Sequence, residues 1–173
     1  MKYFALLRSF VTTALLAVAT IHAAATAPAK AAAAPAAPMP ALRFPLAATD
    51  DGLPGAGPLR RAEWFQKVWN DRRTAFANRV RQDQGALVFL GDSITQGWAD
   101  QGSYFPGLKI ANRGISGDTT RGVLLRLQED VLALNPRGVV LLIGTNDLEE
   151  QATPETIAAN LKLIVAAMKQ HNP

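Results

Sequence analysis

Three short polar blocks hold the residues of this sequence that are suited to chemistry. Residues 91–97 (GDSITQG) place the hydroxyl of Ser93 on a turn between a strand and a helix. Residues 114–120 (GISGDTT) form a glycine-bearing loop, and residues 144–147 (GTND) add the carboxamide of Asn146. A serine hydroxyl is a potential nucleophile, and amide N–H groups stabilise a developing oxyanion. The three blocks together therefore indicate acyl transfer.

Each block also has a purely structural interpretation. Ser93 or Asp92 is a suitable helix cap, and taken alone the cap is the better interpretation of this serine. Asp118 or Thr119 is equally suited to cap the helix that follows the second block. Asn146 is able to stabilise its own turn. Only the combination of the blocks favours catalysis.

Apolar segments come directly before the three blocks. The segments are residues 86–90, 108–111 and 138–143, and each is closed by turn residues. The first and the third are almost entirely apolar, which predicts strands that are covered on both faces. Polar loops that follow parallel strands meet at the carboxyl edge of the sheet. We therefore expect the three blocks to converge there.

Helical periodicity fills the intervals around these strands. Apolar residues recur at three- and four-residue spacing in residues 60–82 and 119–134, and Thr153-Pro154 opens a helix that continues to about residue 169. Strands that alternate with helices predict a parallel α/β sheet. In residues 60–82 we interpret Trp64, Phe65 and Trp69 as packing residues. The arginines of this segment, Arg72, Arg73, Arg79 and Arg81, are interpreted as a solvated face.

The three blocks resemble those of the SGNH, or GDSL, hydrolase family. The matching residues are Gly91-Asp92-Ser93-Ile94, Gly117-Asp118 and Gly144-Thr145-Asn146-Asp147. The sequence of residues 112–120 (NRGISGDTT) is similar to that found in the branch of the family that contains the catalytic subunits of platelet-activating-factor acetylhydrolase. The resemblance covers about residues 64–173. It implies a flavodoxin-like, three-layer parallel sheet and the hydrolysis of esters by serine, with no metal or organic cofactor.

The resemblance also assigns roles to individual residues. Ser93 is the implied nucleophile, and the oxyanion is implied to be held by the amides of Ser93 and Gly117 together with the side chain of Asn146. Gly114 is implied to be a turn residue and not an oxyanion donor. The acidic residues of the blocks are expected to support the loops: these are Asp92, Asp118 and Asp147.

The family completes its catalytic triad with a late Asp-x-x-His block, which is not present in these 173 residues. His22 lies in the predicted leader, and His171 follows a helix that carries the chain about 24 Å away from the catalytic edge. His171 is therefore expected to be a solvated residue at a helix C-terminus and not the base. The sheet is expected to stop after its third strand and the following helix, as in an N-terminal fragment of a longer esterase.

The beginning of the chain has the composition of a targeting segment. Residues 1–27 combine Lys2 and Arg8 with an apolar stretch and small residues, which predicts a cleaved signal peptide, export to the periplasm or medium, and no stable membrane anchor after cleavage. Residues 28–58 are rich in Ala and Pro, which predicts a mobile linker. Residues 59–173 are then the N-terminal part of the hydrolase domain.

Composition limits the functions that remain. The chain has no cysteine, which excludes disulfides and thiolate sites. Its net charge of +4 is spread over interspersed acids and bases, so no nucleic-acid partner is expected. We expect an exported esterase that removes a short acyl group, acetyl above all, from a carbohydrate, lipid or aryl ester, with low activity in this chain. The alternative is a non-catalytic binding or assembly protein that has lost the catalytic base.

Overall fold

The computed structural model describes residues 43–98 and 101–171. The predicted signal peptide (1–27) and the first half of the predicted linker lie outside the described residues. Within the described part of the chain, no helix has the length and apolar character needed to cross a bilayer.

A parallel three-stranded sheet forms the centre of the described domain. Its strands are β1 (Leu87–Gly91), β2 (Ile110–Gly114) and β3 (Gly138–Leu142), in the order β2-β1-β3. In register, Gly91 at the end of β1 faces Gly114 on one side and Leu142 on the other. The carboxyl ends of all three strands therefore meet at one edge, as the sequence predicts for a parallel α/β sheet.

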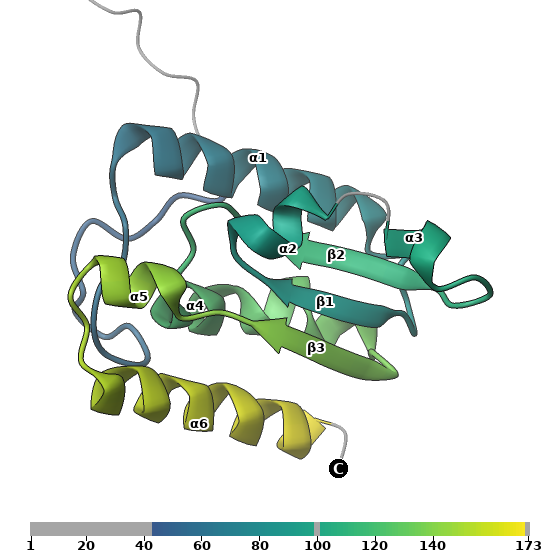
Figure 1. The fold of residues 1–173 in the computed structure, drawn as a ribbon. Coiled ribbons are helices and arrows are strands. Elements are labelled where there is room, and N and C mark those ends of the chain that lie inside the picture. The colour runs from purple at the N-terminus through teal and green to yellow at the C-terminus, as the bar shows by residue number, and fades with distance from the viewer. Residues whose placement is uncertain (1–42, 99–100, 172–173) are drawn as a thin grey trace, which may run out of the picture. The chain divides into compact units, whose positions relative to one another are not determined.

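Three long helices and several short ones surround the sheet. The long helices are α1 (Glu63–Arg79), α4 (Thr120–Asp130) and α6 (Pro154–His171). The short ones are α2 (Ser93–Gly97), α3 (Gln101–Tyr104), the 3₁₀ turn Leu132–Leu134 and α5 (Thr145–Glu149). Figure 1 shows α2 and α3 in front of the sheet and α4 behind it. The predicted fold class is confirmed, although β2 continues through residues 112–114, which the sequence assigned to a turn.

One face of the sheet carries the main hydrophobic core. Val88 and Leu90 alternate along β1 toward this face, and both are fully buried. They pack with Val123 and Leu127 of α4 and with Ile164 of α6. Side chains at three- and four-residue spacing give each helix an apolar stripe, and these stripes meet the sheet.

Helix α1 packs through a second apolar cluster beside α4. Phe65 and Trp69 are buried there against Ile115, as the sequence predicts. Trp64 differs from the prediction because its side chain is 51% exposed. Arg73 also differs: it is buried instead of solvated, because it lies on the apolar stripe four residues after Trp69 and forms an ion pair with Asp130 at 3.0 Å.

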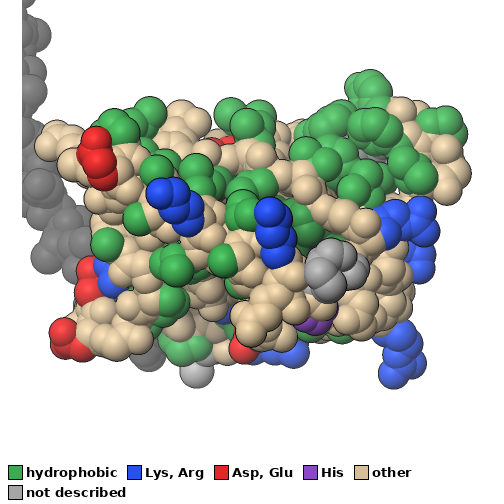
Figure 2. Space-filling view, turned by 90° about the horizontal axis from the view of Figure 1, so that it is seen from below, with side chains coloured by type: hydrophobic (Ala, Val, Ile, Leu, Met, Phe, Trp, Pro, Cys, Tyr) green, Lys and Arg blue, Asp and Glu red, His purple; other side chains and the backbone are tan. Residues whose placement is uncertain are grey.

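The opposite face of the sheet is only partly covered. Phe89 points to this side and packs against Trp98 and Phe105, with ring centroids 5.2 and 5.7 Å away. On β3, Val140 and Leu142 are 44% and 50% exposed, so the prediction that this strand is covered on both faces is wrong. Hydrophobic side chains gather in the upper right of the surface seen from below (Figure 2). This side carries only short helices, which leaves apolar surface in contact with solvent.

The described part of the predicted linker is bound to the domain. Residues 43–58 contain no helix or strand, as their turn-rich composition indicates. Arg121 of α4 nevertheless binds Asp50 at 2.5 Å and the carbonyl of Gly57 at 2.9 Å. Asn160 of α6 exchanges hydrogen bonds with the backbone of Ala56. This segment is therefore a packed extension of the domain and not a free tether.

The unequal covering of the two sheet faces leads to a prediction about stability. Replacing Leu90, which is fully buried, by alanine is expected to lower the free energy of unfolding by about 3 kcal/mol. The matched change Leu142→Ala, on the exposed face, is expected to alter it by no more than about 0.5 kcal/mol. Urea denaturation of both variants measures the difference. Equal losses in the two variants would contradict the assignment of the core to one face.

Candidate active site

Ser93 lies at the exposed start of α2, directly beyond the end of β1. The carboxylate of the buried Asp92 accepts a hydrogen bond from the amide of Ile94 at 2.9 Å and so caps the helix. The cap role thus falls to Asp92, which leaves the Ser93 hydroxyl without a hydrogen bond to any described residue. Gly91 is required before them, because a Cβ atom there would lie 2.2 Å from the carbonyl oxygen of Leu142.

The glycine block forms a tight loop between β2 and α4. The amide of Ser116 donates to the side-chain oxygen of Gln96 at 2.7 Å, which ties this loop to α2. Gly117 has a φ of +84°, a region that side chains strongly disfavour. Its amide N–H has no acceptor among the described residues, whereas the amide of Asp118 donates to Ile115 at 3.1 Å. The free N–H of Gly117 is therefore available to a ligand.

Asn146 connects the third block to the second. It lies in the first turn of α5, and its carboxamide nitrogen donates to the carbonyl of Asp118 at 2.7 Å. The nitrogen carries a second hydrogen that this bond does not use. The neighbouring Asp147 is fully buried and accepts hydrogen bonds from the amide and the hydroxyl of Thr120, at 2.9 and 2.5 Å.

The structure therefore brings the predicted blocks to one edge of the sheet. Direct hydrogen bonds join the third block to the second, and Gln96 joins the second to the helix that begins with Ser93. The acidic residues of the blocks all point inward: Asp92 caps α2, Asp147 binds the first residue of α4, and Asp118 forms a buried ion pair. Gly114 ends β2, where a Cβ atom would lie 2.2 Å from the amide nitrogen of Gln96.

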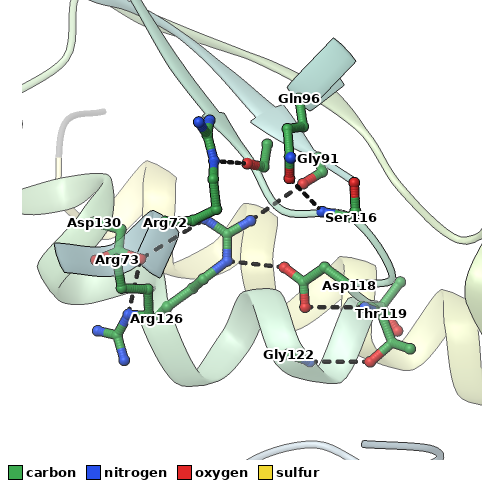
Figure 3. A network of polar contacts seen from close by, with 12 residues as sticks. Arg72, Arg73, Gly91, Gln96, Ser116, Asp118, Thr119, Gly122, Arg126 and Asp130 are labelled. Carbon is green, nitrogen blue, oxygen red and sulfur yellow. Dashed lines mark hydrogen bonds and ion pairs between the residues drawn. The ribbon is translucent and has the colours of Figure 1, made fainter. Parts of the chain in front are cut away.

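A buried arginine joins the first two of these blocks. Arg126 reaches from α4 to the carboxylate of Asp118 at 2.8 Å and to the carbonyl of Gly91 at 3.2 Å (Figure 3). Both side chains of the pair are fully buried. Burial disfavours the charged carboxylate and raises the pKa of Asp118 to about 6, although the nearby Arg126 guanidinium opposes this rise.

Sequence analysis missed Arg126 and Gln96 as supporting residues. A signal for Arg126 was present, since it lies three residues after Val123 and therefore on the buried stripe of the helix. Gln96 follows Ser93 by three residues, and nothing in that spacing distinguishes it from an ordinary polar residue of a short helix.

His171 lies at the far end of the domain from Ser93. It is exposed in the last turn of α6 and lies 3.2 Å from the side-chain oxygen of Asn135, which precedes β3. It is therefore next to the amino end of a strand, as the length of the helix predicts. It is the one histidine among the described residues, so none of them places an imidazole beside Ser93. These residues also contain no group of three or more acidic or histidine side chains arranged to hold a metal ion.

Comparison with known proteins connects this geometry to a family of enzymes. The model of the GDSL-like Lipase/Acylhydrolase family matches residues 89–173. Platelet-activating factor acetylhydrolase IB subunit alpha2 from Rattus norvegicus is 31% identical over 109 residues, covering 61% of this chain and 47% of the relative. An acetylxylan esterase from Geobacillus stearothermophilus is 36% identical and covers 38% of this chain and 41% of the relative.

The fold has a counterpart among solved structures. A structure from Streptococcus pneumonia that is named for platelet activating factor superposes with a TM-score of 0.54 at 26% identity. The match covers 64% of this chain and 52% of that one. The chain therefore spans about half the length of the relatives that it matches.

The raised pKa of Asp118 predicts a dependence of stability on pH. Between about 3.8, the ordinary value, and about 6, the folded chain binds a proton at Asp118 that the unfolded chain does not. The resulting stabilisation is fully present below the lower value and is lost as the pH rises through about 6. Relative to Asp118→Asn, the wild type should therefore gain up to about 3 kcal/mol in unfolding free energy on acidification from pH 7 to pH 4.

Urea denaturation of both proteins across this range measures the gain. Carbon-13 NMR of the Asp118 carboxyl gives its titration midpoint directly and does not require the variant to fold. A difference between the proteins that does not change with pH, or a midpoint near 4, would contradict the prediction.

The conformation of Gly117 predicts a second effect. In Gly117→Ala the new Cβ would lie 2.6 Å from the Cη2 atom of Trp64, in a backbone region that costs an L-residue about 1–2 kcal/mol. We expect the free energy of unfolding to fall by at least that amount. The matched change Gly85→Ala, at φ +69° with open space around it, carries only the backbone cost. Thermal unfolding of the pair should show the greater loss at Gly117, and a smaller loss there would contradict the contact.

Proposed function

We propose that this chain is part of an exported serine ester hydrolase of the GDSL-like lipase/acylhydrolase family, whose model matches residues 89–173, and that it removes a short acyl group. The observation that supports the proposal most strongly is the set of unused donors at one edge of the sheet. The amide of Gly117 has no acceptor among the described residues, and Asn146 is held beside it with one N–H to spare. Ser93 is exposed at the same edge.

In the proposed reaction the Ser93 oxygen attacks the acyl carbon and the hydroxyl proton passes to a general base. The carbonyl oxygen becomes an oxyanion, which the amides of Ser93 and Gly117 and the carboxamide of Asn146 would hold. The tetrahedral intermediate collapses to an acyl-serine as the alcohol leaves with a proton, and water then releases the acid. The bonds that hold these donors in place are already formed without a ligand, so little reorganisation is needed.

The base is the component that the described residues do not supply. His171 lies beside the amino end of β3 and cannot reach Ser93. A serine without a base loses most of its activation, while the oxyanion donors still leave some catalysis over water. We therefore propose that the 173-residue chain by itself hydrolyses esters slowly.

The relatives support a short acyl group and an ester of an alcohol. The names of two of them, an acetylhydrolase and an acetylxylan esterase, refer to acetyl esters. Export is proposed from residues 1–27, whose basic start and apolar stretch match a signal peptide.

A second candidate function is binding or assembly without catalysis. The observation that favours it is the exposed apolar face of β3, where Val140 and Leu142 have no covering element among the described residues. Covalent labelling of Ser93 by a fluorophosphonate would favour the hydrolase, because this probe reacts only with an activated serine. Absence of the label would favour either the binding function or a hydrolase chain that lacks its base.

The proposed mechanism predicts weak activity in this chain. Hydrolysis of p-nitrophenyl acetate is expected to be roughly 10⁴-fold slower than by a serine esterase with a complete triad. Replacing Ser93 by alanine should remove the remaining burst of nitrophenol, whereas Ser103→Ala, a change outside the predicted site, should not. Stopped-flow absorbance at 400 nm measures both.

Two outcomes would count against this account. A normal esterase rate that Ser93→Ala abolishes would mean that the chain does contain a base. A slow rate that is the same in both variants, with no fluorophosphonate label on Ser93, would favour the non-catalytic function.

A further inference from the structure

A cavity of about 390 Å³ lies between the start of α1 and the end of α5. The side chains of Arg60 and Trp64 line it from one side, and those of Glu149 and Glu150 line it from the other. None of these residues belongs to the three blocks that form the proposed catalytic site.

The cavity shares both of its walls with that site. A Cβ atom on Gly117 would lie 2.6 Å from Cη2 of Trp64 and 3.2 Å from Nη1 of Arg60, so both side chains abut the loop that offers the oxyanion amide. The opposite wall is the last turn of α5, the same short helix that carries Asn146 in its first turn. A group bound here would therefore contact side chains that abut the Gly117 loop and the helix that carries Asn146.

Trp64 presents an aromatic surface to this cavity. Its neighbour along the helix, Phe65, meets the ring edge-on at 5.7 Å, and the guanidinium of Arg60 lies 5.7 Å from its centroid. The side chain is nevertheless 51% exposed, whereas Trp69 on the same helix is buried. Large aromatic side chains left exposed in a cavity are typical of ligand-stacking positions.

The charged groups of the cavity are paired and fixed in place. Arg60 donates from Nη2 to Glu149 at 2.5 Å and from Nε to Glu150 at 2.7 Å. Arg61, which also lines the cavity, forms an ion pair with Asp50 at 2.5 Å. Arg60 is therefore shared by the two glutamates, Arg61 is paired with Asp50, and the lining offers both donors and acceptors. Such a set suits a neutral ligand with several hydroxyl groups, and the nearby guanidinium disfavours a cationic head group on the ring of Trp64.

We propose that this cavity is a subsite for a sugar ring in the alcohol part of the ester. In this subsite one face of the ring stacks on Trp64, and its hydroxyls bind the Arg60, Glu149 and Glu150 side chains. The proposal rests on the proposed function, because it takes the sugar to be the alcohol part of the ester. It makes Trp64 a specificity-determining residue, which corrects its interpretation from the sequence as a packing residue.

Isothermal titration calorimetry on the 173-residue chain tests the subsite without requiring turnover. The ligands are an O-acetylated xylo-oligosaccharide, its deacetylated form and phosphocholine. We expect saturable binding of both sugars and none of phosphocholine. In Trp64→Ala the dissociation constant for the sugars should rise at least about tenfold, and in Trp64→Phe, which keeps an aromatic face, by less than about threefold.

The matched control is Trp98→Phe, which alters another partly exposed tryptophan that packs against Phe89 and is not part of the cavity. Its affinity for the sugars should equal that of the wild type. Circular dichroism verifies that each variant is folded, and if Trp64→Ala is not, then Glu149→Ala with Glu150→Ala removes the acceptors instead and should weaken binding to a similar extent.

Three outcomes would overturn the subsite. They are no saturable sugar binding up to about 10 mM, equal affinity of the folded Trp64→Ala variant and the wild type, or binding of phosphocholine in preference to sugar. The reactivity of Ser93 is measured separately with the fluorophosphonate on the wild type. Labelling without sugar binding would retain the hydrolase and reject the subsite. Sugar binding with neither labelling nor a nitrophenol burst that Ser93→Ala removes would retain the subsite and reject the hydrolase.

Discussion

The buried ion pair between Arg126 and Asp118 is the interaction on which the arrangement of the site depends. Removing two charges from water is costly, so a pair of this kind adds little net stability but strongly restricts geometry. Here the guanidinium also binds the carbonyl of Gly91, so one side chain of α4 fixes the end of β1 and the start of its own helix at once. Gly122 gives the carboxylate its space, because a Cβ atom there would lie 1.9 Å from Asp118.

A second set of polar contacts fixes the other side of the same loops. Asp147 binds the amide and hydroxyl of Thr120, and that hydroxyl accepts a hydrogen bond from Asn160 of α6 at 2.9 Å. Asn160 in turn holds the backbone of Ala56. The third strand's loop, the start of α4, helix α6 and the N-terminal extension thus form one continuous network.

The sequence was sufficient for the parts of the molecule that periodicity and turn chemistry determine. The three strands, the long helices and the edge where Ser93, Gly117 and Asn146 meet all follow from apolar runs closed by glycine, aspartate or asparagine. The sequence did not predict burial correctly where the residue type and the position on the helix point to different environments. Arg73 and Arg126 both lie at three- or four-residue spacing from buried apolar residues, yet their charge suggested solvent. Pairing with an acid distant in sequence decides such cases, and no local pattern reveals the acid. Trp64 is the opposite case, because it lies off the apolar stripe and is exposed although its residue type suggested burial.

The proposed site separates two components that a serine esterase normally combines. The donors for an oxyanion are backbone and carboxamide groups that folding of the described residues already holds in place. Activation of the nucleophile needs a base, and the described residues provide none at this edge of the sheet. Stabilisation of a developing charge and removal of a proton therefore depend on different parts of the molecule.

Since the oxyanion donors act on any carbonyl group, selectivity must come from the surfaces beside them. The cavity between α1 and α5 is such a surface, because Trp64 and Arg60 abut the loop that carries Gly117. On the proposed mechanism, the described residues thus select the ester and polarise its carbonyl group.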